Sequence, residues 1–248
     1  MIEDEPVSIT ADRINISGLL TGDNNAPVGA VLFLHGGGKT NSKSIFRPWQ
    51  KALAAVGFLT LAIDFRGCGD SSGEFTDGSL THRLTDARAA VNFLRKVSRL
   101  PENRICIAGS SMGGHITARL TDTFPDVSSV ILVCAAAYSG SSEPLRLDDS
   151  FTRAIRHPDS FADSPAFRSL SRFPGSILTI YGEHDRIIPG PVAARYESFG
   201  RSRGAAIRIP GAAHQLLQPK SPDDAKRMRD LIDGSIAFLR QLFPVRSG

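Results

Sequence analysis

The stretch that decides the fold runs from Arg104 to Phe124 and reads RICIAGSSMGGHITARLTDTF. Residues 105–108 form an apolar, partly β-branched run, which predicts a short buried strand. Further on, apolar residues recur at helical spacing and predict a helix: Ile116, Leu120 and Phe124. The turn between them, Gly109-Ser110-Ser111-Met112-Gly113, fits the G-x-S-x-G pattern, in which a strained strand-to-helix bend exposes a serine. We therefore predict Ser111 as a nucleophile.

The same pattern occurs at two other places in the chain, so the local context has to select one. Residues 69–73 match it but lead into a turn-rich loop where the bend requires a helix. Residues 200–204 match it between a predicted helix and a predicted strand, which is the reverse order. Only Ser111 has the right context, and the alternative is that Ser111 is an ordinary helix N-cap serine.

Composition predicts one globular domain. The chain has 248 residues, of which 41% are hydrophobic and 22% charged, and we expect residues 1–248 to form a single domain. No segment approaches the length of a membrane span, and the acidic start at Met1 lacks the features of a signal peptide. These features predict a cytoplasmic protein without a membrane partner.

Cysteine spacing and charge argue against a metal site and a nucleic-acid partner. The three cysteines, Cys68, Cys106 and Cys134, lack metal-ligand spacing, so we expect buried thiols and no metal or other cofactor. The net charge is +4, but the basic residues are not interleaved with aromatic ones as in a nucleic-acid platform. We therefore expect no nucleic-acid partner. The oligomeric state stays open, with a homodimer as one alternative.

Along the chain, predicted strands alternate with predicted helices. An antiparallel ribbon turning near Asp12 comes first, and further strands are expected at 30–34, 58–63, 105–108, 130–136, 176–181 and 205–209. Helices are expected at 44–56, 84–94 and 192–199, and Ser221 is the expected N-cap of a last helix. This alternation predicts an α/β fold, with a mostly parallel eight-stranded sheet covered by helices on both faces.

A serine hydroxyl needs a base that removes its proton and an acid that orients the base. His214 follows the last predicted strand in a loop of small residues, and Asp185 follows the strand before it. In hydrolases with this serine turn the order is serine, acid, histidine, which these residues obey. Glu183 is the nearest rival acid and is expected to brace the loop. Other acids remain alternatives if the acid follows the earlier strand: Asp148, Asp149, Asp159 and Asp163.

The reaction also needs donors for the oxygen that becomes negative. The N–H of Met112, directly after the serine, is one candidate. The run His35-Gly36-Gly37-Gly38 follows a predicted strand, and its glycines allow a close backbone approach, so the N–H of Gly37 is the second candidate. We expect His35 to orient this loop by hydrogen bonds.

With these residues, nearly the whole chain resembles the α/β-hydrolase superfamily. The resemblance rests on residues 35–36, 64–67, 109–114 and 182–185, together with His214. Residues 64–75 resemble the corresponding loop of feruloyl and cinnamoyl esterases and of serine aminopeptidase-like hydrolases, although residues 37–41 lack the bulky residue that many relatives have there. The resemblance implies an α/β-hydrolase fold and a broad esterase-type activity.

Three functions follow as hypotheses. The first is hydrolysis of a small-molecule ester through an acyl-enzyme, and the second applies the same residues to a thioester or a small peptide or amide. The third is a binding protein that keeps the fold without turnover, against which the complete set of Ser111, Asp185 and His214 argues.

The segment 138–175 is expected to form a short cap insert over the serine. Its phenylalanines supply apolar surface, and its acidic and basic residues balance, so no anionic substrate is indicated. We predict that Gly38, Phe151 and Phe161 contact the substrate. A lid of this size favours short-chain or aromatic acyl groups over long lipid chains; the alternative is that the phenylalanines only anchor the insert.

Overall fold

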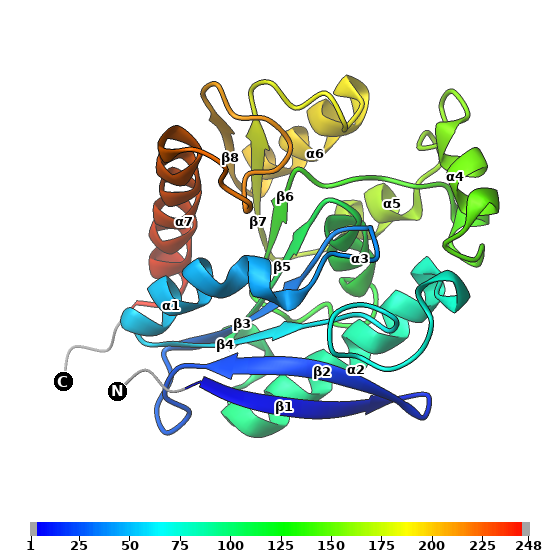
Figure 1. Ribbon diagram of the computed structural model, residues 1–248. Helices are drawn as coiled ribbons and strands as arrows, with labels where there is room; N and C mark the ends of the chain where they lie inside the picture. The colour runs from blue at the N-terminus through cyan, green and yellow to red at the C-terminus, as the bar shows by residue number, and fades with distance from the viewer. Residues whose placement is uncertain (1–3, 245–248) are drawn as a thin grey trace.

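The computed structural model describes residues 4–244, which form one eight-stranded sheet flanked by helices (Figure 1). In space the strands follow the order β1-β2-β4-β3-β5-β6-β7-β8. Their bounds are β1 Asp4–Ala11, β2 Ile14–Thr21, β3 Gly29–Leu34, β4 Phe58–Ile63, β5 Ile105–Ser110, β6 Ser129–Val133, β7 Ser176–Gly182 and β8 Gly204–Ile209. Strand β1 pairs antiparallel with β2, and β2 pairs antiparallel with β4. All other neighbouring strands pair in parallel. The predicted α/β architecture is confirmed.

The antiparallel ribbon turns at Asp12 and Arg13, both of which have left-handed backbone angles, φ 48° and φ 66°. Two successive left-handed residues match the twist of the flanking strands, which explains the two-residue hairpin. The parallel strands β3 and β4 are buried along their whole length, as continuous apolar runs covered on both faces require.

Helices cover both faces of the sheet. Their bounds are α1 Arg47–Ala55, α2 Leu80–Ser98, α3 Met112–Leu120, α4 Asp149–Arg156, α5 Pro165–Arg172, α6 Gly190–Arg203 and α7 Pro222–Leu242, with short 3₁₀ turns at Lys43–Phe46, Phe75–Asp77, Glu102–Arg104 and Gly140–Ser142. Helices α1 and α7 pack against each other, and α2, α3, α5 and α6 form a second contiguous row (Figure 1). Helix α7 begins as predicted, because the Ser221 side chain accepts a hydrogen bond from the N–H of Asp224. No helix within residues 4–244 is long and apolar enough to span a membrane.

Several predicted elements differ in their bounds from the structure. Helices α2 and α6 extend beyond the expected ranges 84–94 and 192–199, and two further differences have a local cause. The strand expected at 130–136 ends at Val133, because Cys134 has φ 43° and a left-handed residue cannot continue the pleat. The helix expected at 44–56 begins as the 3₁₀ turn at Lys43–Phe46 and becomes α-helical only at Arg47.

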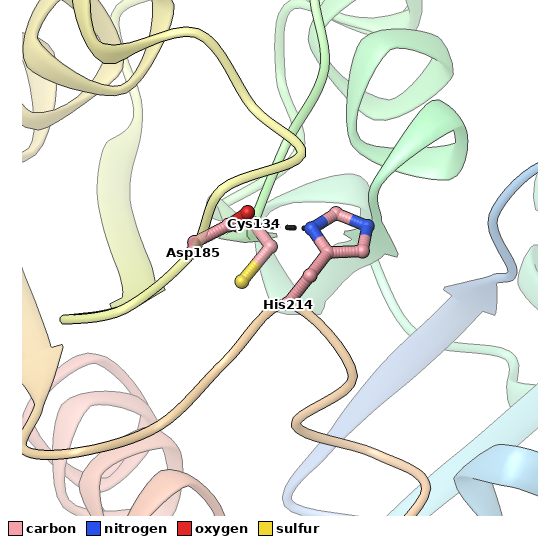
Figure 2. A group of neighbouring side chains, drawn as sticks. All are labelled: Cys134, Asp185 and His214. Carbon is pink, nitrogen blue, oxygen red and sulfur yellow. Dashed lines mark hydrogen bonds and ion pairs between the residues drawn. The ribbon is translucent and has the colours of Figure 1, made fainter.

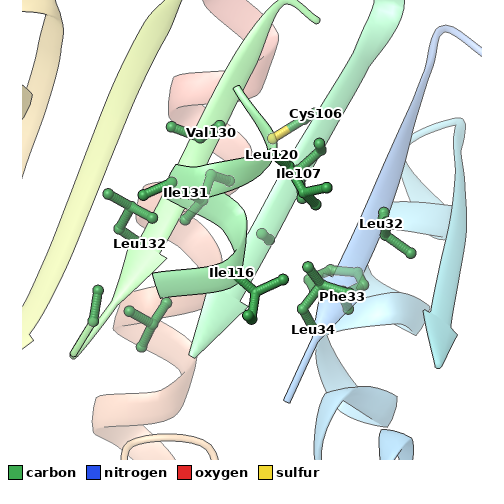
Figure 3. Close-up of a cluster of buried hydrophobic side chains, with 14 of the residues drawn as sticks. Leu32, Phe33, Leu34, Cys106, Ile107, Ile116, Leu120, Val130, Ile131 and Leu132 are labelled. Carbon is green, nitrogen blue, oxygen red and sulfur yellow. The ribbon is translucent and has the colours of Figure 1, made fainter. Parts of the chain in front are cut away.

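The core lies between the middle strands and helix α3, which follows the predicted serine turn. Leu32 and Leu34 of β3, Ile107 of β5 and Val130 of β6 lie on the sheet face that packs against Ile116 of α3, and all of them are fully buried (Figure 3). Strand β3 lies between β4, which is the next strand in the sequence, and β5. In an open α/β sheet, a ligand site forms at the carboxyl edge where the strand order reverses. The loops after β3 and β5 therefore meet where a site is expected.

Candidate active site

Ser111 occupies a strained bend between β5 and α3. Its backbone angles, φ 54° and ψ −118°, are rare for any residue other than glycine. The bend is held on both sides, since the N–H of Ser111 donates to the carbonyl of Val133 at 2.9 Å, and its carbonyl accepts from Gly114 and Ala136 at 2.9 Å each. A Cβ at Gly109 or Gly113 would collide with neighbouring backbone atoms. The G-x-S-x-G pattern therefore corresponds to a strained bend at Ser111 that the surrounding contacts hold in place.

His214 and Asp185 lie in a row with Ser111. The distance from His214 Nε2 to Ser111 Oγ is 3.1 Å. His214 Nδ1 lies 2.9 Å from Asp185 Oδ2, and Figure 2 shows this pair. The geometry fits a neutral imidazole whose Nδ1–H donates to the carboxylate and whose Nε2 accepts the serine proton. Asp185 follows β7 and His214 follows β8, so both reach the carboxyl edge of the sheet.

Asp185 is held as an ion. Burial by itself raises the pKa of its carboxyl group, but the hydrogen bond and charge of His214, together with two backbone donors, lower the pKa below its ordinary value. The two backbone donors are the N–H groups of Ile187, at 2.9 Å, and Ile188, at 3.1 Å, both to Oδ1. Oδ2 is left for His214, which fixes the orientation of the imidazole.

The rival residues have other partners. Glu183 accepts a hydrogen bond from the N–H of Gly211 at 2.8 Å and so braces the loop before His214, as expected. His115 is buried and contacts Glu143 Oε1 at 3.0 Å through Nε2, and burial is the main cause of its lowered pKa. His157 is exposed, and its Nδ1 lies 2.7 Å from the carbonyl of Pro158.

Both serines in the competing motifs also have local structural partners. The Ser71 hydroxyl donates to the carbonyl of Asp64 at 2.7 Å and accepts from the N–H of Ser17 at 2.8 Å. Ser202 is exposed on α6 and donates to the carbonyl of Phe199 at 3.0 Å. Neither hydroxyl forms a hydrogen bond with an imidazole of the described residues.

The glycine loop after β3 is tied back by its carbonyl groups. The Gly36 carbonyl lies 2.8 Å from His35 Nδ1 and accepts from Arg83 Nη1 at 3.0 Å. The Gly37 carbonyl accepts from the Asn41 side chain, and the Gly38 carbonyl accepts from the Asn41 N–H at 3.2 Å. Because the N–H and C=O of a trans peptide point in opposite directions, the N–H of Gly37 points away from Arg83 and His35.

His35 orients this loop by hydrogen bonds, as expected. The N–H of Phe65 donates to His35 Nε2 at 3.2 Å, so Nδ1 carries the proton and donates to Gly36. Burial, followed by the charge of Arg83, lowers the pKa of His35 to about 3. The ring is therefore neutral, with the tautomer that the loop requires.

The two N–H groups predicted to stabilise the oxyanion have no backbone acceptor in the loops that the structure describes. Within the described residues, neither the N–H of Met112 nor that of Gly37 donates to another backbone group outside the helices. Met112 is the first residue of α3, where an N–H has no partner inside the helix, and its side chain packs against Gly37. The two predicted donors thus come from adjacent segments.

A pocket of about 460 Å³ opens beside Ser111 and His214. Gly37 and Gly38 line it, whereas Phe151 and Phe161 do not. The other walls are partly apolar, with Ile45, Tyr138, Ile187 and Leu217, and partly uncharged polar, with Thr40, Asn41, Gln215 and Gln218. No Asp, Glu, Lys or Arg is among the described residues that line it. The pocket therefore suits an uncharged ligand.

The insert contributes to this pocket at one residue only, Tyr138. Phe151 is buried beneath it, with ring centroids 5.4 Å apart, and Phe161 is partly buried against the core. Helix α5 of the insert packs against α3 and α6. This placement does not support direct substrate contact by Phe151 or Phe161.

One group of side chains has donor atoms close enough for a metal ion. Donor atoms of Cys134, Asp185 and His214 all lie within 4.8 Å of one another (Figure 2). The hydrogen bond between His214 and Asp185 already uses two of these donors. Burial, and then the charge of Asp185, raises the pKa of the Cys134 thiol, and a protonated thiol is a poor ligand. The arrangement therefore suits a base and its orienting acid better than a metal.

Several residues at or behind the pocket escaped the sequence analysis, among them Ile187, Tyr138 and Arg83. Ile187 is 68% exposed at the pocket, and Tyr138 lies at the start of the insert. Arg83 is buried behind the glycine loop. A sequence signal existed for Arg83, because it falls on the helix face marked by Leu80, Leu84 and Ala87, where a charged residue is unusual.

Comparisons with known proteins identify the family of the chain. The chain matches the family described as alpha/beta hydrolase fold over residues 29–157. It is 24% identical over 217 residues to acylamino-acid-releasing enzyme 2 of rice, covering 77% of this chain and 28% of that protein. It is 24% identical over 220 residues to esterase LipC of Mycobacterium tuberculosis, covering 76% of this chain and 53% of that protein.

The chain thus spans between about a quarter and a half of the length of these two relatives. Among solved structures, it is similar to Est1E from Butyrivibrio proteoclasticus with ferulic acid bound, with a TM-score of 0.71 and 18% identity. That similarity covers 94% of this chain and 99% of the other. At this level of identity, it shows the shared fold.

Proposed function

This chain belongs to the α/β-hydrolase fold family, and from that premise we propose that it is a serine hydrolase that cleaves carboxylic esters of small or aromatic acyl groups. The observation that carries the proposal is the hydrogen-bonded row of Ser111, His214 and Asp185, with distances of 3.1 Å and 2.9 Å. A hydroxyl on a strained bend, next to an imidazole fixed by a carboxylate, is the arrangement that activates a serine.

In the first half of the reaction, Ser111 Oγ attacks the ester carbonyl carbon while His214 Nε2 takes the hydroxyl proton. The imidazolium is stabilised by Asp185, whose pKa is raised by burial but lowered below its ordinary value by His214 and the two backbone donors. The oxygen that becomes negative accepts hydrogen bonds from the N–H groups of Met112 and Gly37. His214 then gives its proton to the leaving alcohol, and the acyl group stays on Ser111.

In the second half, a water molecule takes the place of the alcohol. His214 removes a proton from this water, which attacks the acyl-enzyme carbonyl, and the same two N–H groups stabilise the second oxyanion. Return of the proton to Ser111 Oγ releases the acid and restores the starting state.

The substrate class follows from the walls of the pocket. A volume of about 460 Å³ suits a small ligand, and the lining carries no charged Asp, Glu, Lys or Arg side chain. Ile187 and Tyr138 offer apolar surface for an acyl or aryl group. One similar structure holds ferulic acid, an aromatic acid, which supports the aromatic part of the proposal by analogy.

Hydrolysis of an amide or thioester is the second candidate. Side-chain amides of Asn41, Gln215 and Gln218 line the pocket and could bind a polar acylamino group. A relative named acylamino-acid-releasing enzyme points the same way. Parallel assays with matched ester, thioester and acylamino substrates decide between the candidates by comparing kcat/KM.

The test of the proposal is Ser111→Ala. We expect the variant to lose hydrolysis of p-nitrophenyl acetate by at least about 10³-fold, because no other group replaces the nucleophile. Labelling of the wild-type protein by a fluorophosphonate should map to Ser111 by peptide mass spectrometry.

The two competing serines are matched controls. Ser71→Ala and Ser202→Ala should both keep wild-type labelling and turnover, since their hydroxyl groups bind backbone carbonyls. Labelling of either serine in place of Ser111, or activity that survives in Ser111→Ala, would reject the assignment.

A further inference from the structure

Arg83 is a buried cation whose hydrogen bonds go only to neutral groups. It lies in helix α2 with 1% of its surface exposed. Within the described residues no carboxylate forms a salt bridge with it, and Asp86, the nearest acid on its helix, pairs with Arg66 instead. Its Nε–H is buried and has no hydrogen-bond partner. Such a charge is costly to bury, so its position calls for an explanation.

The contacts of Arg83 all lie on or behind the glycine loop. Nη1 donates to the Gly36 carbonyl at 3.0 Å, and Nη2 approaches Cys68 Sγ at 3.8 Å. The guanidinium carbon lies 4.5 Å from the centre of the Phe65 ring, a cation–π contact. Arg83 therefore contacts only neutral groups, and the carboxylate of Asp86 acts on its charge without a direct contact.

The carbonyl that Arg83 contacts belongs to the same peptide group as the N–H of Gly37. In a trans peptide these two groups point in opposite directions, so a donor on the carbonyl side aims the N–H to the other side, where the pocket lies. A positive charge at the carbonyl oxygen also polarises the peptide and makes its N–H a stronger donor. His35 supplies a second, neutral donor to the same oxygen at 2.8 Å.

We propose that Arg83 is a positioning residue for the oxyanion hole, whose buried positive charge strengthens the Gly37 N–H as a donor and stabilises the negative oxygen formed at Ser111. The inference rests on the proposed hydrolase function and extends it. Arg83 touches neither the substrate nor the reacting atoms. The negative charge that Arg83 can stabilise at the glycine loop appears only when the oxyanion forms, so its effect falls on the transition state rather than on the bound substrate.

Two variants separate the charge from the hydrogen bond. Arg83→Gln can keep a donor for the Gly36 carbonyl but removes the charge, whereas Arg83→Lys keeps the charge and loses the planar fork. We expect kcat to fall by about 10- to 100-fold in Arg83→Gln with KM changed less than about twofold. Arg83→Lys should keep more of kcat than Arg83→Gln.

A readout other than turnover separates this role from simple structural support. An arylboronic acid becomes tetrahedral and anionic on a serine, whereas an ester substrate binds uncharged. The affinity for the boronic acid should fall in Arg83→Gln by about the same factor as kcat/KM. Because the buried variant could unfold, urea unfolding is measured first, and Arg83→Met, which also removes the charge, takes its place in the same comparisons if Arg83→Gln does not fold.

Arg203→Met is the matched control. Arg203 also donates its guanidinium to backbone carbonyls, including that of Leu170 at 2.8 Å, but it lies on α6 away from the pocket lining. It should lose stability without losing boronic-acid affinity or kcat.

Two results overturn the role of Arg83 while leaving the proposed function intact. One is a folded Arg83→Gln whose kcat and boronic-acid affinity stay within about twofold of wild type. The other is a loss that appears in KM alone. Absence of both turnover and serine labelling in the wild-type protein would instead reject the proposed function, and with it this inference.

Discussion

At the scale of single residues, His35 links the stability of the molecule to the shape of its glycine loop. Its ring is fully buried, with one nitrogen accepting from Phe65 and the other donating to Gly36. A second proton would destroy the first hydrogen bond and place a cation beside Arg83. Burial and this neighbouring charge are why its pKa falls to about 3.

The pKa of His35 predicts a loss of stability in acid. An unfolded histidine titrates near 6.5, so between pH 6.5 and about 3 the unfolded state binds more protons than the folded state. The contribution is present above this window and is lost as the pH falls through it. From pH 7 to pH 5, we expect the free energy of unfolding to fall by about 2 kcal/mol more in wild type than in His35→Gln. Urea unfolding at the two pH values measures this difference.

His157→Gln is the control for that experiment, because His157 is exposed. Its unfolding free energy should follow the wild-type dependence on pH. An equal acid sensitivity of His35→Gln and wild type would show that His35 is protonated equally in both states, contrary to its burial.

Residue chemistry could be predicted where a motif and a strand end coincide. Ser111, Asp185 and His214 each follow a recognisable strand, so the sequence was sufficient to bring them to one edge of the sheet. Arg83 could not be predicted in its role, because nothing in the sequence shows which carbonyl a buried side chain will reach. The left-handed backbone at Cys134 was likewise hidden, since an apolar run gives no sign of where its pleat stops.

At the scale of elements, the insert acts on the pocket through its first residue. Tyr138 lines the pocket, and its ring packs 5.1 Å from His115 and 5.4 Å from Phe151. Phe151 is therefore a support for Tyr138. The selection of substrates that we predicted for the insert should accordingly depend on Tyr138.

We expect Tyr138→Ala to lower kcat/KM for an aryl ester by about tenfold relative to an acetyl ester, because an apolar wall of the pocket is removed. Phe161→Ala, which alters an insert residue outside the pocket lining, should leave the ratio of the two kcat/KM values unchanged. Kinetics with a series of p-nitrophenyl esters measures both ratios. The same shift in both variants would mean that the insert acts by general loosening.

Element boundaries were predictable where burial is continuous and less so in the insert. Strand β4 lies where its apolar run predicts, and α5 begins at Pro165, a residue type that favours the first turn of a helix. Helix α4 was not predicted, because its eight residues are largely charged and polar around a single buried side chain, Phe151. Such a short amphipathic segment is stable only against its neighbours, which the sequence does not identify.

At the scale of the whole molecule, one sheet joins regions that are far apart in the sequence. Trp49, the only tryptophan, is buried in α1 with its ring 4.8 Å from Phe33 of β3. Cys134 is buried at the end of β6, two strands beyond β3. Unfolding of the sheet would therefore change the surroundings of both side chains.

A shared sheet predicts one cooperative unfolding transition. Trp49 fluorescence and the labelling of the Cys134 thiol, followed by peptide mass spectrometry, should change at the same urea concentration. The far-ultraviolet circular dichroism should change there too. Thiol labelling that precedes the fluorescence change would show two units of separate stability, contrary to the single domain expected from the sequence.

The hydrogen bond between His214 and Ser111 joins residues 103 positions apart. A growing chain emerges from the ribosome at about 5–20 residues per second, so roughly 5–20 seconds separate the synthesis of the serine from that of its imidazole. During that interval β5 and α3 can already form the bend around Ser111, while β8 and the loop after it do not yet exist. The site is thus completed late in translation, after the sheet that holds it is almost entirely made.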